Sequence, residues 1–315
     1  MNLKYKIGII GAGSIGRRHL RNIVEVLSSR NISFEIDLIR SGTGNPITSE
    51  EAAYICNTYL SYDDIPDDYD ILFITNPTHL HYETIIKYSN KTKHMFIEKP
   101  VFDQSDIDIR DLGLKKNGVY YVACPLRYTE VIQYLKKELH NLKIYSARAI
   151  CSSYLPDWRP NQDYRECYSA HKDQGGGVSI DLIHEWDYIS YLFGHPESVF
   201  NIRDHFSDLE IDSDDLSIYI ARYPHMAVEL HLDYFGRKTI REICIFTESD
   251  TIIGDITNSE VRYLKKEETI SFKEKRNDFY LKEMEHFYDI LAGVEKNDND
   301  ILTALHTLRL TKEGK

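Results

Sequence analysis

Short apolar runs and amphipathic segments alternate along the first third of the chain. Apolar runs of about five residues predict buried strands, and the segments between them carry apolar residues at helical spacing. Alternation of strand and helix predicts a parallel sheet with helices on both faces, the α/β class. The predicted strands cover residues 6–10, 34–39, 70–74, 94–97 and 119–123, and the predicted helices cover residues 14–29, 79–90 and 104–117.

The rest of the chain follows a different pattern. Between residues 226 and 235, large apolar residues occupy every second position, and this period of two predicts a strand with one covered face. Helices are predicted near 128–140, 278–293 and 299–313. The change of pattern, together with a length between one large domain and two ordinary ones, predicts two domains, residues 1–123 and 124–315.

Composition and charge narrow the class of protein. The chain has 315 residues, of which 42% are hydrophobic, so it can bury a sizeable core. Its 38 basic and 50 acidic residues give a net charge of −12, which repels nucleic-acid backbones and anionic membrane surfaces. We therefore expect neither partner.

Cysteine usage and the apolar runs bear on compartment. The five cysteines are widely spaced and form no C-x-x-C pair, so neither a disulfide framework nor a zinc site is indicated. The amino-terminal apolar run is short and broken by glycine, which indicates a strand and turn rather than a signal peptide. No run approaches the roughly 18 apolar residues of a membrane span. A soluble, cytoplasmic protein is expected.

A glycine-rich turn, G-x-G-x-x-G, directly follows the first predicted strand. In this pattern the first glycine permits a tight turn, the second lets a pyrophosphate approach the backbone, and the third allows close helix packing. The phosphate then contacts free N–H groups at the helix start. The position of the turn, at the first strand-to-helix junction, predicts a dinucleotide site. Its contacts are expected at Gly11, Gly13, Ser14, Ile15 and Gly16.

The end of the second strand predicts which dinucleotide binds. NAD recognition requires a carboxylate there for the ribose 2′-hydroxyl, whereas this strand ends in Arg40 and Ser41. A guanidinium and a hydroxyl suit a 2′-phosphate, so NADP(H) is favoured over NAD(H). The alternative is that Arg40 is a solvated surface charge and that Asp37, in the middle of the strand, binds the ribose. Arg17 and Arg18 are further candidates for neutralising phosphate.

Several motifs occur in an order that resembles the Gfo/Idh/MocA family of nicotinamide-dependent sugar and polyol oxidoreductases. They are the glycine turn, ITNPTHLHYETI at 74–85, HMFIEKPVF at 94–102, QGGGVSIDLIHEWDYISYLFG at 174–194 and DFYLKEMEHFYDIL near the end. The resemblance covers nearly the whole chain. It implies an N-terminal Rossmann domain and a C-terminal α+β domain with a large, mostly antiparallel open sheet. Family members commonly pair through that sheet, so a homo-oligomer, a dimer or a tetramer, is expected.

The resemblance also implies roles for residues near the cofactor. Asn76 and Pro77 are expected to lie against it, and Lys99 is expected to reach the oxygen on the reacting carbon. A hydride leaving a carbinol carbon requires removal of the hydroxyl proton, and the reverse reaction requires protonation of an alkoxide. Glu98 would anchor the turn, and Pro100, often cis in the family, would stiffen it. The alternative for Glu98 and Lys99 is a surface ion pair of little energetic value.

Two histidines form an H-x-H motif at the start of the second predicted helix. His79 and His81 suggest a metal site, but no third ligand lies nearby in the sequence, and the family needs none. No metal is therefore expected. His81 is predicted to cap the helix or to line the cofactor pocket.

A second catalytic candidate follows the glycine run 175–177. Asp181 and His184 are three residues apart, so on one helix they share a face, and the carboxylate could orient the imidazole. Many family members carry the two residues four apart, which leaves open whether Asp181 or Glu185 supports the histidine. His184 could also be a packing residue. The glycine run and the resemblance favour a proton-transfer role for His184 together with Lys99.

The stretch 152–177 is dense in tyrosine, tryptophan and arginine. Aromatic faces stack on sugar rings, and arginines form bidentate hydrogen bonds with carboxylates or phosphates. An anionic sugar is slightly favoured over a neutral polyol, and the WRP and HE patterns resemble oxidoreductases of bacterial surface-sugar pathways. The predicted substrate contacts are Arg127, Tyr154, Trp158, Arg159, Tyr164 and Arg165.

Two classes of function remain compatible with these residues. The leading hypothesis is an NAD(P)-dependent dehydrogenase or reductase that acts on CH–OH or C=O of a sugar or sugar derivative, including a keto or unsaturated intermediate. The alternative is a protein of the same fold that senses dinucleotide or sugar without chemistry. The presence of both Lys99 and His184 favours the enzyme.

Overall fold

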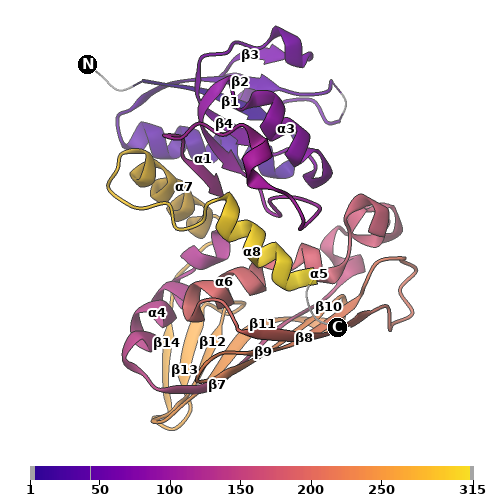
Figure 1. Ribbon diagram of the computed structural model, residues 1–315, viewed down its shortest axis with the longest axis vertical. Helices are drawn as coiled ribbons and strands as arrows, with labels where there is room; N and C mark the ends of the chain where they lie inside the picture. Colours follow the sequence, from indigo (N-terminus) through magenta and orange to yellow (C-terminus); the bar gives the residue numbers. More distant parts are fainter. Residues whose placement is uncertain (1–3, 43, 313–315) are drawn as a thin grey trace. The chain divides into compact units, whose positions relative to one another are not determined.

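The computed structural model describes residues 4–42 and 44–312, and these form two compact units (Figure 1). Unit 1 consists of the chain up to Ala123 together with Tyr280–Leu305. Unit 2 consists of Cys124–Phe279 together with the described residues from His306 on. The sequence placed a single boundary between residues 123 and 124. In the structure the chain also returns to unit 1 near its end.

Unit 1 is built on a six-stranded sheet in the order β3-β2-β1-β4-β5-β6, in which every neighbouring pair is parallel. The predicted Rossmann-like fold is confirmed. The order reverses between β1 and β4, which is where open α/β sheets bind their ligands. The strands are β1 (Lys4–Ile10), β2 (Ser33–Ile39), β3 (Ile55–Tyr59), β4 (Tyr69–Ile74), β5 (Thr92–Ile97) and β6 (Tyr120–Val122).

The helices of unit 1 include the long helix α1 (Ser14–Ser29), which follows the glycine turn, and helix α7 (Asp278–Leu291), which comes from near the end of the chain. Helix α1 has the predicted bounds. Helix α7 contributes Phe287, whose ring packs edge-on against Phe96 of β5 with centroids 5.2 Å apart. This aromatic packing explains why most of α7 belongs to unit 1. The others are α2 (Ser49–Ala52), α3 (His81–Tyr88) and α8 (Ile301–Lys312), which runs on into unit 2.

Two local predictions in unit 1 are wrong. The helix predicted over 104–117 is only a 3₁₀ turn, Ile109–Leu112, because the Asp108 side chain accepts the backbone N–H of Arg110 and Gly113 leaves in a left-handed conformation at φ 65°. Such local bonding by aspartate competes with helix formation. Strand β3 was missed because its sequence, ICNTY, has a partly polar pattern with little apolar signal.

Unit 2 contains an eight-stranded sheet in the order β14-β13-β12-β11-β7-β10-β9-β8. It is antiparallel except for the parallel pair β7 and β10, which confirms the predicted large, mostly antiparallel sheet. The strands are β7 (Ile144–Tyr154), β8 (Ser198–Asp204), β9 (Leu216–Arg222), β10 (Ala227–Asp233), β11 (Phe235–Thr247), β12 (Thr251–Asp255), β13 (Glu260–Tyr263) and β14 (Glu268–Ser271).

Helices cover one face of this sheet (Figure 1). They are α4 (Glu130–Glu138), α5 (Val178–Asp181) and α6 (Ile183–Phe193). Val228 and Leu230 of β10 are fully buried in the same core as Trp186 of α6, whereas Glu229 between them is exposed. The period of two predicted for 226–235 is therefore confirmed. None of the helices in the described ranges combines the length and apolar character needed to cross a membrane.

Candidate functional site

The glycine turn in unit 1 has the geometry that a pyrophosphate requires. Gly11 adopts φ +105°, and a Cβ at Gly16 would lie 2.3 Å from the carbonyl oxygen of Gly11, so both positions need glycine. A Cβ at Gly13 would meet no described atom within 4 Å. Helix α1 begins at Ser14, and no side-chain hydrogen bond caps it within the described chain. Its first N–H groups and the open space at Gly13 fit a dinucleotide phosphate.

The loop after β4 packs against this turn. The Thr75 hydroxyl lies 3.0 Å from the carbonyl oxygens of both Ile10 and Gly11. Asn76 donates from Nδ2 to the Thr84 hydroxyl at 2.8 Å, and its Oδ1 is buried with no hydrogen-bond partner among the described residues. An orphaned acceptor at this place suits a donor from a bound cofactor. Asn76 and the exposed Pro77 after it are thus at the edge where the order of the strands reverses.

His81 is buried and connects two segments of unit 1. Its Nε2 lies 3.0 Å from the carbonyl oxygen of Asn76, and its Nδ1 lies 3.1 Å from that of Pro100. Burial lowers the pKa of the imidazole, although the neighbouring carbonyls act in the opposite direction. His81 therefore joins the loop after β4 to the segment after β5. Among the described residues no group of three or more His, Cys, Asp or Glu is arranged to hold a metal ion.

Glu98, directly after β5, is buried and not part of a surface ion pair. Its Oε1 lies 2.5 Å from Nε2 of His19, and its Oε2 accepts the backbone N–H of Lys99 at 3.2 Å. Burial raises the pKa of the Glu98 carboxyl, but the hydrogen bond and charge of His19 outweigh it and hold the pKa below its ordinary value. The half-buried Lys99 precedes a cis peptide bond to Pro100. His19 was missed because no local motif identifies it as a partner of Glu98.

Asp37 is not placed to bind a ribose. Only 3% of the residue is exposed. Its Oδ1 accepts from the Asn57 side chain at 2.9 Å, and its Oδ2 accepts from the Tyr69 hydroxyl at 2.8 Å. Burial, reinforced by the hydrogen bond to Asp37, raises the pKa of that tyrosine. Both carboxylate oxygens are therefore engaged within the sheet.

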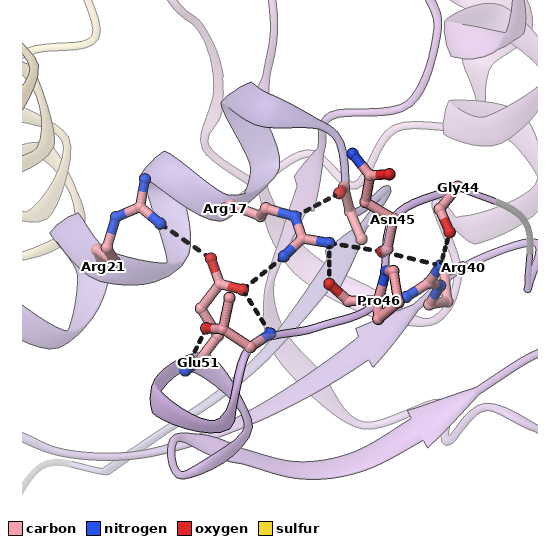
Figure 2. Close-up of polar contacts among 9 residues, drawn as sticks. Arg17, Arg21, Arg40, Gly44, Asn45, Pro46 and Glu51 are labelled. Atoms are coloured by element: carbon pink, nitrogen blue, oxygen red, sulfur yellow. Dashed lines mark hydrogen bonds and ion pairs between the residues drawn. The ribbon is translucent and has the colours of Figure 1, made fainter.

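The arginine at the end of β2 faces the loop that follows it. Arg40 is half-buried, and its Nη2 lies 3.4 Å from the carbonyl oxygens of Gly44 and Asn45 (Figure 2). Ser41 is exposed beside it. The part of this loop that the structure describes thus curls around the guanidinium of Arg40.

A second arginine holds the same loop from the helix. Arg17 donates from Nη2 to the carbonyl oxygens of Asn45 at 2.6 Å and Pro46 at 2.9 Å, and from Nε to that of Ala12 at 3.0 Å (Figure 2). Its Nη1 donates to Glu51 at 2.6 Å. Nε, Nη1 and Nη2 of Arg17 therefore all donate to protein oxygens, and its expected role in neutralising phosphate does not fit this geometry.

Glu51 is the acid at the centre of this network. It is buried, it receives Arg17 and Arg21 on its two oxygens, and it closes a capping box with Thr48 at the start of α2 (Figure 2). Burial alone raises the pKa of the Glu51 carboxyl, but the Thr48 hydrogen bonds and the charge of Arg17 lower it overall. The carboxylate thus stays ionised and holds α1, α2 and the loop before α2 together.

The second predicted catalytic segment lies in unit 2 and is not one continuous helix. Helix α5 ends at Asp181 and α6 begins at Ile183, because Leu182 turns the chain with φ −96° and ψ 28°. The expectation that Asp181 and His184 share a helix face is therefore wrong. The two acids bind different partners. Asp181 accepts from the Tyr234 hydroxyl at 2.5 Å. Glu185 forms a buried ion pair with Arg241 at 2.7 Å. His184 is half-buried between them in sequence.

Two of the three arginines predicted to bind substrate are paired with protein acids. Arg127 is buried and donates to both oxygens of Asp187 at 2.8 and 2.7 Å. Arg165 is exposed and pairs with Asp163 and Glu210, each at 2.7 Å. Arg127 is therefore held by a buried ion pair within unit 2, and Arg165 already has two carboxylate partners.

The aromatic candidates gather around the ends of β7 and β10. Trp158 donates from Nε1 to the Ser153 hydroxyl at 2.9 Å and packs edge-on against Tyr234, and the Arg159 guanidinium lies 5.6 Å from the centre of the Tyr168 ring. Tyr154 and Tyr164 line a cavity of about 360 Å³. A further arginine, Arg237, also lines it and was missed, because it belongs to no motif.

The predicted residues thus fall into two groups. Lys99, Glu98 and the predicted cofactor contacts belong to unit 1. Asp181, His184 and the predicted substrate contacts belong to unit 2. Within unit 1 the structure brings together the glycine turn, Asn76 and the Glu98-Lys99 segment at one end of the sheet.

Comparison with known proteins agrees with this arrangement. The Gfo/Idh/MocA family model, described as an oxidoreductase family with an NAD-binding Rossmann fold, matches residues 5–119. The uncharacterized oxidoreductase YrbE of Bacillus subtilis is 29% identical over 190 residues, which are 59% of this chain and 53% of that protein. The chain thus matches about half the length of this relative.

Two further relatives match over most of their length. Myo-inositol 2-dehydrogenase of Thermotoga maritima is 24% identical over 301 residues, which cover 90% of this chain and 86% of that protein. A structure of levoglucosan dehydrogenase in complex with NADH and levoglucosan has a TM-score of 0.83 at 17% identity, and the match covers 98% of this chain and 95% of that one. This likeness shows that the two chains share a fold.

Proposed function

We propose that the chain is a member of the Gfo/Idh/MocA oxidoreductase family, whose model matches residues 5–119, and that it exchanges a hydride between a nicotinamide dinucleotide and a sugar or sugar derivative. The observation that carries the proposal is the placement of Lys99. Glu98, held by His19, accepts the backbone N–H of Lys99 at the same end of the sheet as the glycine turn. The side-chain amine of a lysine at this position can accept a proton from a reacting oxygen in its neutral form and donate one in its charged form.

The proposed mechanism divides the work between cofactor and protein. The bound dinucleotide supplies the hydride acceptor or donor. Lys99 takes the proton from the substrate hydroxyl during oxidation and returns it to the oxygen during reduction. His184 of unit 2 is the second proton-handling group. Glu98 and His19 act as positioning residues, since Glu98 accepts the backbone N–H of Lys99 and His19 holds the Glu98 carboxylate.

We propose that NADP(H) is preferred over NAD(H). The preference is supported by Arg40 and Ser41 at the end of β2 and by the engagement of both Asp37 oxygens inside the sheet. A guanidinium forms charge-assisted, two-pronged hydrogen bonds with a phosphate, whereas a ribose hydroxyl needs a carboxylate acceptor.

A homo-oligomer formed through the uncovered face of the large sheet is also proposed, with a second copy of this chain as the partner. Phe200, Ile202 and Ile220 on β8 and β9 are 50%, 48% and 53% exposed, and Phe200 pairs directly with Ile220 across the two strands. Contiguous apolar side chains on an open face mark an interaction surface.

Fluorescence titration with NADPH and with NADH tests the proposal. The wild type is expected to bind NADPH more tightly, and Arg40→Asp is expected to remove the preference. Arg110→Asp is the matched control, because Arg110 is an exposed arginine of the same unit that pairs with Asp108. Protein that binds neither nucleotide would overturn the proposal. Tighter binding of NADH would overturn the preference alone. Oxidation of NADPH by keto-sugars then identifies the substrate.

A further inference from the structure

A cavity of about 360 Å³ lies wholly within unit 2, where the strands β7 and β11 meet. Its volume is in the range of pockets that hold small molecules. Aromatic side chains supply much of its lining, and one arginine and one aspartate supply charge. The lining consists of Tyr154, Tyr164, Phe206, Ser207, Asp208, Leu209, Phe235 and Arg237.

Arg237 stands on an irregular segment of β11. Phe235 pairs with Tyr154 of β7, but the next pair is Ile240 with Ser152, so residues 236–239 are left out of the regular register. A Cβ at Gly236 would lie 1.9 Å from the Ser152 hydroxyl, so this position needs glycine. A bulge of this kind turns a side chain away from the sheet and is common beside functional sites.

The bulge is held by a buried acid. Asp233 accepts on Oδ1 from the backbone N–H of Gly236 at 2.8 Å and from the Ser152 hydroxyl at 3.0 Å. Its Oδ2 lies 2.9 Å from Nε2 of His231. Asp233 is almost fully buried, so its charge is compensated by these donors. The conformation that presents Arg237 is therefore built into the strand junction.

A second buried acid holds the part of the lining that consists of residues 206–209. Asp215 is fully buried and accepts the backbone N–H groups of Phe206 at 2.8 Å and Ser207 at 2.9 Å. The Tyr164 hydroxyl accepts the backbone N–H of Glu210 at 3.2 Å. The loop that carries Asp208 is thus ordered by several hydrogen bonds, and the cavity does not depend on a single flexible side chain.

The guanidinium of Arg237 stacks on an aromatic ring, and this contact does not use its N–H donors. It lies 3.9 Å from the centre of the Tyr154 ring. The N–H groups of an arginine lie in the plane of the guanidinium, so stacking on a face leaves them available for a carboxylate or phosphate. Arg165, nearby in sequence to Tyr164, differs because its guanidinium already pairs with Asp163 and Glu210.

We propose that this cavity binds an anionic sugar, with Arg237 holding its carboxylate or phosphate. The aromatic walls suit the C–H face of the ring, and Asp208 suits a ring hydroxyl. The inference rests on the proposed function in one respect, namely that the ligand is a sugar. Tyr234, adjacent in sequence to the lining residue Phe235, donates to Asp181 at 2.5 Å, so one residue connects the lining to the segment that carries His184.

Calorimetric titration of the full chain without nucleotide tests this inference. The probes are methyl glucuronoside, glucose-6-phosphate and the neutral methyl glucoside. We expect at least one anionic probe to bind about tenfold more tightly than methyl glucoside, and which one binds distinguishes a carboxylate from a phosphate ligand. Arg237→Gln is expected to abolish the difference, and Arg237→Lys to retain part of it.

The matched control is Arg148→Gln, which removes an exposed arginine of unit 2 that pairs with Glu229 and is expected to leave the preference unchanged. Thermal melting verifies that each variant is folded. Equal affinity for charged and neutral probes, or an unchanged preference in Arg237→Gln, overturns the inference. The titration measures binding and not turnover, so the two proposals can fail separately. A binding preference that depends on Arg237 supports the inference even if no sugar is oxidised. NADPH-linked turnover without such a preference supports the proposed function and overturns the inference.

Discussion

Nε2 of His19 lies 2.5 Å from Oε1 of Glu98, so the helix after the glycine turn is joined to the segment that carries Lys99. Both side chains are buried, and the His19 ring also packs edge-on against Phe96 with centroids 4.9 Å apart. The other oxygen of Glu98 accepts the Lys99 backbone N–H. Two contacts thus connect the helix after the glycine turn to the backbone of the proposed catalytic lysine.

The acid stability of the protein is expected to depend on Glu98. Its pKa is held below the ordinary value of 4.5, so its ionised form stabilises the folded state above pH 4.5, and this contribution is lost as the pH falls through the folded pKa. Glu98→Gln should therefore be less stable at pH 7 by about 3 kcal/mol and should lose less stability as the pH falls below 4.5. Urea unfolding at several pH values measures both effects.

The control for this prediction is Glu25→Gln, which changes an exposed glutamate of α1. It is expected to unfold like the wild type at each pH. An acid limb that is equally steep in Glu98→Gln would contradict the assigned role of the His19 and Glu98 pair.

Replacement of Lys99 by methionine separates an enzyme from a sensor. If Lys99 transfers the proton, Lys99→Met should lower kcat by about 10²–10⁴-fold while the affinity for NADPH changes by less than about threefold. Lys93→Met, a change at an exposed lysine of β5 that pairs with Asp70, should have wild-type activity. A sensor without chemistry would show no turnover in the wild type and an unchanged ligand response in Lys99→Met.

Glu51 is expected to influence cofactor selection without touching the cofactor. Glu51→Gln removes the charge that receives Arg17, and Arg17 in turn holds the carbonyl groups of Asn45 and Pro46 beside Arg40. The loop should then present Arg40 less well, because ordering it costs conformational entropy. We expect NADPH affinity to fall about tenfold and NADH affinity to fall less, as measured by fluorescence titration. An equal loss for both nucleotides would indicate a purely structural role.

The proposed contact between copies is tested at β9. Ile220→Lys introduces a charge into the exposed apolar face, opposite Phe200, and desolvating that charge should disfavour association. Light scattering at micromolar protein is expected to give a dimer or tetramer for the wild type and a smaller mass for the variant. Leu264→Lys changes a comparably exposed leucine outside β8 and β9 and should leave the mass unchanged. A wild type of monomeric mass would contradict the proposal.

Local pattern was enough for much of the fold and for part of the site. The bounds of α1, five of the six strands of the parallel sheet and the glycine turn follow from periodicity and from backbone needs that neighbouring residues meet. Where side chains bonded to their own backbone, as Asp108 does, the helix predicted from pattern did not form. The partly polar strand β3 was missed for a different reason. A hydrophobic pattern detects buried positions, and β3 buries few of its residues.

The sequence by itself determined the class of fold and the chemical identity of the candidate groups. Only the tertiary structure decided which of those groups are available. Asp37, Arg127 and Arg165 met partners in the folded chain, and Glu98 met His19, 79 residues away. Arg237 was instead left stacked on Tyr154 at a cavity. The physical reason is that a charged side chain is neutralised by whichever counter-charge the fold brings near, and that proximity is set by long-range packing rather than by residues adjacent in sequence.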